Sequence, residues 1–466
     1  MKIKKVIQNQ IVMKKLLTLC LLAGCLLATT AQPLPQVAPE LAGMDSRRLR
    51  YADQAIEQAI RKGDIPGAVL GVVHRGKLAY VKAYGNKEVY PSTVPMEVNT
   101  LFDLASCTKS ISTAISAMIL IERGQLRLLD RVNLYIPGFQ GWEGEDGHKK
   151  EIRIVDIMTH TSGLPSYAPV EEVVEKYGAP APDGLIEYIS TCPRQYEPQQ
   201  GFVYSCLNYV TLQRVIEIIS GQPLHEFAKE HIFDVLGMES TTYFPTGELL
   251  ERTAPTEKMK DGSVLRGVVH DPMARILNGG NSGNAGLFSD VQDLAILAAA
   301  LLNEGEYNGK RILSPLGVKT MRTVPRSAAK FGRTPGWDVC SAYASNNGDL
   351  LGPHTFGHTG YTGTSFIVDP DNDVAVIFLT NRVHPDDSGE IVRLRSLVAN
   401  AVGAALCPPP AHLHRTLLQA GRTVPPRRAD PLRRDRDAGQ QSHRGRRRLE
   451  QTPRQEKNTQ PGYRGR

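Results

Sequence analysis

The chain has 466 residues and 41% of them are hydrophobic, so it is long enough for two or three structural units and can bury a core over most of its length. Its net charge of +7 is concentrated at one end, because residues 411–466 hold fifteen Arg or Lys against five Asp or Glu, and the remainder is slightly acidic. This distribution argues against a basic nucleic-acid-binding domain, and we expect no nucleic-acid partner.

The N-terminus predicts an export signal over residues 1–31. Two lysines precede an apolar stretch over residues 16–28, and small residues then lead to a cleavage point after Ala31. The stretch is shorter than a membrane-spanning helix requires. The segment Leu22–Cys25 also resembles a lipoprotein cleavage box, so a lipid anchor at Cys25 stays open as an alternative. In both cases we expect the protein in the periplasm or cell envelope.

Hydrophobic periodicity predicts helices near both ends of the folded part and strands beside them. Residues 45–62 have helical spacing, and two strand-like runs over residues 68–73 and 78–84 are joined by a turn at His74–Lys77. A strong helix is predicted from Ser106 to Arg123. The other predicted elements are helices over residues 205–220, 288–302 and 391–404 and strands over residues 364–368 and 374–380.

This order of elements predicts an α/β fold. Strands at both ends and helices between them indicate an antiparallel β-sheet flanked by the terminal helices, with a mainly helical region of about residues 125–290 inserted into it. The folded domain is expected over residues 45–405. After Cys407 the composition turns to Arg, Gln, Pro and Gly without periodicity, which predicts a basic disordered tail over residues 411–466. A shifted reading frame would explain the same abrupt change.

The segment Ser106-Cys107-Thr108-Lys109 is the first candidate for chemistry. A serine hydroxyl is a weak nucleophile unless a base takes its proton, and residues three apart on a helix share one face. The positive end of a helix dipole also favours negative charge that develops there. The spacing alone is a weak signal, because Ser327 to Lys330 repeats it between prolines, where we expect a loop.

Two further segments add the groups that such a serine needs. Tyr204 stands in Tyr-Ser-Cys, and a Tyr held near a Lys can have a lowered pKa and act as general base and acid. His358-Thr359-Gly360 lies immediately before a predicted strand, and its small residues let a substrate approach the backbone. A main-chain N–H there, with that of Ser106, can form an oxyanion hole.

In this order the three segments resemble the serine β-lactamase / penicillin-binding protein family. The likeness is closest to its branch of class C β-lactamases, D-Ala-D-Ala carboxypeptidases and esterases. Met158–Leu164 (MTHTSGL) and Ala285–Ser289 (AGLFS) are similar to two segments that recur in this branch. The resemblance covers about residues 45–405 and implies a β-lactamase/transpeptidase-like fold.

The resemblance also implies a role for each motif residue. Ser106 would be the acylated nucleophile, Lys109 its activating partner and Tyr204 the second proton-transfer group. The main-chain N–H groups of Ser106 and Tyr361 would hold the oxyanion. No metal or cofactor is implied. The residues expected to face the substrate or the oxyanion are Cys206, His358, Thr359, Gly360 and Tyr361.

The middle motif departs from the family pattern at Cys206, where an Asn is usual. A thiol is a weak donor and acceptor, which puts recognition of amide substrates in doubt and leaves room for esters. Asn208 is expected to point elsewhere, and His358 in place of a Lys favours the carboxypeptidase side of the branch. We therefore expect a serine hydrolase that forms an acyl-enzyme on D-Ala-D-Ala-type cell-wall peptides or small esters. A catalytically weak envelope receptor for wall fragments or β-lactams is the alternative.

Other reactive side chains are interpreted as structural. The five cysteines after the signal are an odd number without paired spacing, so we expect free thiols. Cys107 should turn away from Ser106, and His160 should be a buried, hydrogen-bonded loop residue. His225–His231 has the wrong spacing for a zinc site and indicates a surface helix, while the neighbours His270 and Asp271 should not form a catalytic pair.

Overall fold

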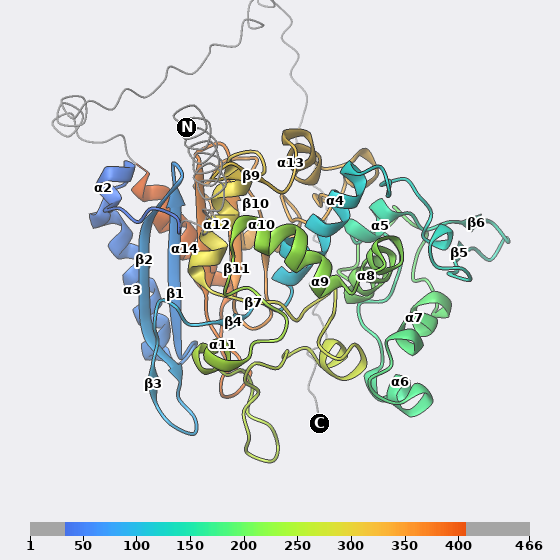
Figure 1. The fold of residues 1–466 in the computed structure, drawn as a ribbon, viewed down its shortest axis with the longest axis horizontal. Coiled ribbons are helices and arrows are strands. Elements are labelled where there is room, and N and C mark those ends of the chain that lie inside the picture. The colour runs from blue at the N-terminus through green and yellow to red at the C-terminus, as the bar shows by residue number, and fades with distance from the viewer. Residues whose placement is uncertain (1–32, 407–466) are drawn as a thin grey trace, which may run out of the picture. The chain divides into compact units, whose positions relative to one another are not determined.

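The computed structural model describes residues 33–406, so the predicted signal, Cys25 and the predicted tail lie outside the described residues. A six-stranded antiparallel sheet organises the described part, with strand order β10-β11-β12-β1-β2-β3 (Figure 1). Its strands are β1 (Gly67–His74), β2 (Lys77–Glu88), β3 (Val94–Pro95), β10 (Phe356–Thr359), β11 (Ser365–Asp369) and β12 (Val374–Leu379). The predicted fold class is confirmed.

The two terminal helices cover one face of this sheet. α3 (Ser46–Lys62) and α14 (Val392–Ala405) lie side by side and share an apolar core with β1 and β12. α3 begins where the Asp45 side chain accepts the Arg47 N–H, and it ends at Gly63, whose φ of 78° only glycine adopts readily. The helix predicted over residues 45–62 is thus confirmed.

The opposite face of the sheet is covered by α12 (Val291–Leu302) and, beyond it, by the inserted helical region (Figure 1). Every residue of β1 is buried, as expected for a strand between two apolar layers. The helices of this region and its flanks are α4 (Ile115–Glu122), α5 (Ile154–Met158), α6 (Val170–Tyr177), α7 (Pro182–Thr191), α8 (Cys206–Ser220), α9 (Leu224–Ala228), α10 (Asp234–Leu236), α11 (Gly247–Arg252) and α13 (Pro315–Met321).

The remaining elements are short. α2 (Pro39–Ala42) precedes α3, and three two-stranded ribbons lie outside the main sheet. The ribbons are formed by β4 (Phe102–Asp103) with β7 (Phe288–Ser289), β5 (Trp142–Glu143) with β6 (Lys149–Lys150), and β8 (Glu306–Tyr307) with β9 (Lys310–Arg311).

The turns that join the central strands follow from their residues. Arg75 and Gly76 have φ of 53° and 67°, the backbone required at both centres of a two-residue hairpin, and His74 pairs with Lys77 across it. At the β11–β12 turn, Asp369 Oδ1 accepts the main-chain N–H of Asp371 at 3.0 Å. Both predicted turns are confirmed.

The helix predicted from residue 288 is wrong at its start. Phe288 and Ser289 form β7, which pairs with β4, and the helix begins at Val291. The cause is Asp290, whose carboxylate accepts hydrogen bonds from the N–H groups of Gln292 and Asp293 and so caps the helix. The backbone of Asp290 is itself extended, so the helix cannot begin before Val291. β4 ends shortly before Ser106 in the chain, and its pairing with β7 anchors the segment that carries Ser106.

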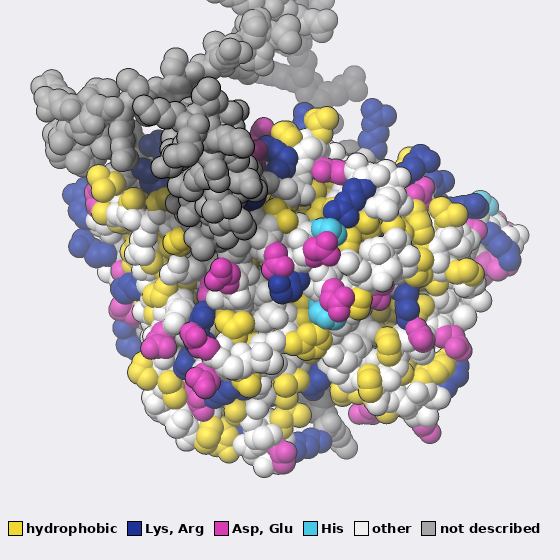
Figure 2. Space-filling view, in the orientation of Figure 1, with side chains coloured by type: hydrophobic (Ala, Val, Ile, Leu, Met, Phe, Trp, Pro, Cys, Tyr) yellow, Lys and Arg dark blue, Asp and Glu magenta, His cyan; other side chains and the backbone are white. Residues whose placement is uncertain are grey.

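The described surface is mixed in charge on the face drawn in Figure 2. Lys and Arg side chains are interspersed with Asp and Glu there, and no broad basic patch is seen among the described residues of that face. Within residues 33–406, no helix is both long and apolar enough to cross a bilayer.

The close approach of β1 and α12 gives a test of this packing. A Cβ built on Gly71 would lie 2.4 Å from Cγ2 of Val291, so we expect Gly71→Ala to lower the free energy of unfolding by about 1–3 kcal/mol. In a Val291→Ala background, which removes that methyl group, the same change should cost less. Urea unfolding of the four proteins measures both values. An equal loss in the two backgrounds would show that the contact does not limit the packing.

Candidate active site

Ser106 lies in a tight turn between β4 and the helix that continues into α4, called the central helix below. Ala105 before it has φ of 45°, an uncommon backbone for a residue other than glycine, and its N–H donates to Asp103 Oδ1 at 2.8 Å. The helix begins at Cys107, one residue later than predicted, because this turn ends at Ser106. Its first part is a π-helical segment (Lys109–Ala114) that continues into α4. Such segments are frequent at functional sites.

Lys109 is completely buried and directed at Ser106. Its Nζ donates to Ser106 Oγ at 3.0 Å, to the main-chain oxygen of Asn284 at 2.9 Å and to Cys206 Sγ at 3.5 Å. Burial disfavours the charged ammonium, but the ionised forms of Cys206 and Tyr204 would attract it, and the balance raises the pKa of Lys109. Asn284 precedes the AGLFS segment, which therefore packs beside the nucleophile.

The phenol of Tyr204 faces the same pair. Lys109 Nζ lies 5.0 Å from the centre of its ring. Burial raises the pKa of Tyr204, whereas the Lys109 charge, a hydrogen bond with Ser106 and the Arg333 charge lower it. Ser106, Lys109 and Tyr204, which lie far apart in the sequence, are thus brought together.

His160 holds Tyr204 in place. The His160 ring lies 4.5 Å from that of Tyr204, and His160 binds both neighbours of Tyr204: its main-chain oxygen accepts from Val203 N–H, and its Nδ1 accepts from Ser205 N–H at 3.1 Å. Burial lowers the pKa of His160 well below its usual value, so the ring is neutral. His160 is buried and hydrogen-bonded, as predicted, but its contact with Tyr204 was not anticipated.

Cys206 contacts Lys109. Its Sγ accepts from Lys109 Nζ, and burial raises the pKa of the thiol. Cys206 is not among the residues that line the cavity around Ser106. Asn208 turns away from the site, as predicted, and its side chain contacts Ser162 and His160. The structure thus brings Cys206 to the catalytic cluster through Lys109.

The strand predicted after His358-Thr359-Gly360 is β11, which begins at Ser365, but His358 and Thr359 themselves belong to a strand that was not predicted. His358 and Thr359 end β10, the edge strand that pairs with β11. His358 Nδ1 lies 2.9 Å from the main-chain oxygen of Thr359, so Nδ1 carries the proton and Nε2 is an acceptor. Burial and the charges of Arg333 and Lys109 lower the pKa of His358 well below its usual value. His358 therefore adds no positive charge.

The turn after β10 is fastened to the segment that leads into Ser106. The hydroxyl of Thr362 donates to Asp103 O at 2.7 Å, and that of Thr364 donates to Leu104 O at 3.0 Å. Gly360 is required here, because an added Cβ would lie 2.4 Å from Leu104 O. The Tyr361 side chain is 58% exposed at the pocket mouth. Within residues 33–406, the main-chain N–H groups of Ser106 and Tyr361 donate to no protein acceptor.

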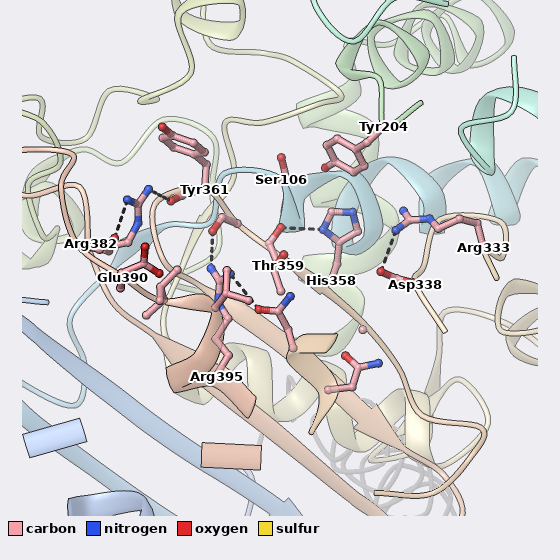
Figure 3. Close-up of a pocket in the computed structure, with 17 residues that line it drawn as sticks. Ser106, Tyr204, Arg333, Asp338, His358, Thr359, Tyr361, Arg382, Glu390 and Arg395 are labelled. Atoms are coloured by element: carbon pink, nitrogen blue, oxygen red, sulfur yellow. Dashed lines mark hydrogen bonds and ion pairs between the residues drawn. The ribbon is translucent and has the colours of Figure 1, made fainter. Parts of the chain in front are cut away.

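A cavity of about 390 Å³ opens over Ser106 and is lined by several basic side chains (Figure 3). Arg333 is 1% exposed and forms an ion pair with Asp338 through Nη1 at 3.4 Å, while its Nε and Nη2 have no partner among the described residues. Arg382 and Arg395 line the cavity nearer to Tyr361. These three arginines were not predicted, because their positions depend on contacts between distant segments.

Apart from Cys206 and His160, the side chains interpreted as structural take no part in the contacts among Ser106, Lys109 and Tyr204 described above. Cys107, Cys192, Cys206 and Cys340 are free, as predicted, and Cys107 Sγ turns to His358 O at 3.4 Å. His225–His231 lies on α9 and the turn after it, and the described residues contain no group of three His, Cys, Asp or Glu able to hold a metal ion. His270 pairs with Glu257 at 3.3 Å.

Comparison with known sequences gives matches along most of the chain. The beta-lactamase family model matches residues 52–400. The chain is 35% identical over 379 residues to a Bacillus subtilis (strain 168) protein named N-acetylmuramyl-L-alanine amidase, covering 74% of this chain and 83% of that protein. It is 33% identical over 398 residues to an Escherichia coli (strain K12) protein named "Putative D-alanyl-D-alanine carboxypeptidase", covering 80% and 91%.

Solved structures share the fold. One is EstCE1, described as a hydrolase with promiscuous acyltransferase activity, with a TM-score of 0.61 and 23% identity over 77% of this chain and 99% of that chain. Another is an octameric penicillin-binding protein homologue from Pyrococcus abyssi, with a TM-score of 0.59 and 22% identity over 78% of both chains.

The charge of Arg333 gives the site a testable pH dependence. Because this charge lowers the pKa of Tyr204, Arg333→Gln should raise that pKa and move the pH profile of fluorophosphonate labelling to higher pH. Arg326→Gln, which removes an exposed charge on the preceding loop, should leave the profile in place. The rate of labelling between pH 5 and pH 10 checks this. A profile that stays fixed or moves to lower pH in Arg333→Gln would contradict the claim that the Arg333 charge lowers the pKa of Tyr204.

Proposed function

The chain belongs to the beta-lactamase family and is a serine hydrolase, and from this premise we propose that it forms an acyl-enzyme through Ser106. We propose as its substrates D-alanyl-D-alanine-type cell-wall peptides, with small esters as the alternative. The observation that carries the proposal is the distance of 3.0 Å between Ser106 Oγ and the buried Lys109 Nζ, with the Tyr204 phenol beside both.

Acylation proceeds by attack of Ser106 Oγ on the substrate carbonyl carbon. The hydroxyl proton passes to the Lys109–Tyr204 pair, and the carbonyl oxygen becomes an oxyanion that the N–H groups of Ser106 and Tyr361 stabilise. The tetrahedral intermediate then expels the leaving amine or alcohol, which takes up that proton. Water hydrolyses the resulting ester by the same steps, which releases the acid and restores the serine.

Lys109 and Tyr204 act as one proton-transfer unit. The Lys109 charge lowers the pKa of Tyr204, while an ionised Tyr204 raises that of Lys109, so each group stabilises the other's charged form. The tilted ring of His160 packs against Tyr204 and keeps the phenol at the nucleophile. A neutral His160 adds no charge that would compete with Lys109 for the phenolate.

The basic cavity supports a substrate with a free carboxylate. Arg333 lines the cavity with a buried guanidinium whose Nε and Nη2 have no partner among the described residues, and its positive charge favours a carboxylate bound in the cavity. A peptide that ends in D-alanine carries such a group on its leaving residue. The curated relatives named for a carboxypeptidase and an amidase support the same class of substrate. The export signal that the sequence predicts over residues 1–31 would deliver the enzyme to the cell wall.

Cys206 is the feature that favours esters as the second candidate. A thiol cannot supply the two-ended amide that pairs with a substrate amide, whereas an ester has no N–H to satisfy. Because Cys206 contacts Lys109, the thiol that replaces this amide lies next to the proton-transfer unit.

The identity of the nucleophile can be tested by labelling. A fluorophosphonate or fluorescent penicillin probe should label the native protein, and Ser106→Ala should abolish labelling because it removes the attacking oxygen. Ser327→Ala is the matched control, since Ser327 has the same spacing to a lysine but lies in a short 3₁₀ turn outside the cavity. Full labelling of Ser106→Ala with loss in Ser327→Ala would refute the assignment.

Replacement of Cys206 tests the substrate class. Cys206→Asn should raise the turnover of a D-Ala-D-Ala peptide relative to a p-nitrophenyl ester by about five- to a hundredfold, because an unpaired amide costs about 1–3 kcal/mol. Steady-state kinetics on both substrates give the ratio, with Cys192→Asn as a thiol control away from the site. If the native enzyme strongly prefers the peptide and the ratio does not change, Cys206 does not influence the substrate and the ester alternative loses its basis.

A further inference from the structure

One charged residue stands on the buried face of α14. Arg395 is 5% exposed, although its neighbours on that face, such as Val398 and Val402, are apolar and pack against the sheet. Its guanidinium extends past the sheet to the floor of the cavity over Ser106 (Figure 3). A buried cation at this position requires a physical explanation, because an apolar residue could be buried there with a smaller desolvation penalty.

The partners of Arg395 are uncharged oxygens, and most belong to the turn after β10. Nη2 donates to Gly360 O at 2.6 Å and to Thr364 O at 3.0 Å, and Nε donates to Gly363 O at 3.3 Å. Nη1 lies 3.4 Å from the amide oxygen of Asn346. No carboxylate of residues 33–406 forms an ion pair with Arg395. Its charge is therefore solvated by dipoles and not neutralised.

The shortest of these bonds acts on one particular peptide group. The carbonyl of Gly360 and the N–H of Tyr361 belong to the same planar amide, so a cation bound to the oxygen draws electron density from the nitrogen. The N–H then becomes a stronger donor. It is the group that the proposed mechanism uses to hold the oxyanion.

We propose that Arg395 is a positioning residue of the oxyanion hole, which fixes the turn at residues 360–364 and polarises the Gly360–Tyr361 peptide toward the reacting carbonyl. This inference rests on the proposed acyl-enzyme mechanism and adds a residue that acts on the oxyanion hole through the Gly360–Tyr361 peptide. The two threonine bonds from the same turn to Asp103 O and Leu104 O fix its other side to the segment that carries Ser106.

The missing counter-ion is consistent with this role. Burial lowers the pKa of Arg395 to about 10, so the guanidinium remains charged at neutral pH. Glu390 lines the same cavity but forms no ion pair with Arg395, and the oxyanion of the tetrahedral intermediate supplies a negative charge at the Tyr361 N–H. An electrostatic interaction that is stronger in the transition state than in the ground state raises kcat more than it changes KM.

Arg382 provides a matched comparison within the same turn. Its Nη2 donates to Tyr361 O at 2.8 Å, so it also fastens the turn, but that oxygen shares its peptide group with the N–H of Thr362. Its charge is neutralised by Asp387, with Nη1 to Oδ1 at 2.6 Å. Loss of Arg382 removes an anchor of the turn without removing the polarisation of the Tyr361 N–H.

The experiment compares Arg395→Met, Arg395→Lys and Arg382→Met with the native full-length enzyme. The kinetics of p-nitrophenyl acetate hydrolysis give kcat and KM, and inhibition by phenylboronic acid, which binds Ser106 as a tetrahedral anion, reports on the oxyanion hole. We expect Arg395→Met to lower kcat and weaken boronate binding by about ten- to a hundredfold, with KM changed by less than about threefold. Arg382→Met should lower both by less than about threefold, and Arg395→Lys, which keeps the charge, should lie between.

Equal losses of boronate affinity in Arg395→Met and Arg382→Met would overturn the inference, as would a loss confined to Tm or KM. Should Arg395→Met fail to fold, Arg395→Lys carries the test. A folded Arg395→Lys enzyme with a lowered Tm but native boronate affinity would also overturn the inference. The proposed function fails separately, if fluorophosphonate does not label Ser106 in the native enzyme.

Discussion

The site depends on a completely buried lysine ammonium that has no carboxylate partner within hydrogen-bond reach among the described residues. Such a charge is stable only where oxygen and sulfur dipoles replace water, and Lys109 meets them in the Asn284 carbonyl, the Ser106 hydroxyl and the Cys206 thiol. This requirement explains why the AGLFS segment, the Tyr204 loop and the central helix converge on one point. The same charge makes the serine hydroxyl and the Tyr204 phenol more acidic, so the interaction that orders the site also prepares it for proton transfer.

The second constraint is the junction between the edge of the sheet and the turn that carries Ser106. Two threonine hydroxyls and a glycine that permits close approach join the strand end at residues 358–364 to residues 103–104. The nucleophile and the two candidate oxyanion donors therefore belong to one rigid unit, although they come from opposite ends of the domain. Arg395, which extends from α14 past the end of the sheet, donates to the carbonyl groups of the same turn and so connects the terminal helix layer to the site.

Local signals in the sequence predicted most of the elements and the residues of the three motifs. The helix over residues 45–62, the strands β1, β2, β11 and β12 and the spacing of Ser106 and Lys109 depend on neighbours a few positions away, and these were found. The short strands β3 and β10 were not predicted. Arg333 and Arg395 could not be found in this way, because an arginine becomes a buried site residue only through contacts with segments far along the chain. The helix start at Val291 was missed although Asp290 signals a cap, since the apolar run from Phe288 suggested an earlier start.

Ser106 and the preformed N–H groups of Ser106 and Tyr361 are the proposed centre of the chemistry. A crystal structure of the enzyme with a peptide boronic acid tests this most directly, because the adduct imitates the tetrahedral intermediate. The account predicts a covalent bond from boron to Ser106 Oγ and one boronate oxygen within hydrogen-bond distance of the main-chain nitrogens of Ser106 and Tyr361. An adduct on another residue, or on Ser106 with both boronate oxygens turned away from Tyr361, would contradict it.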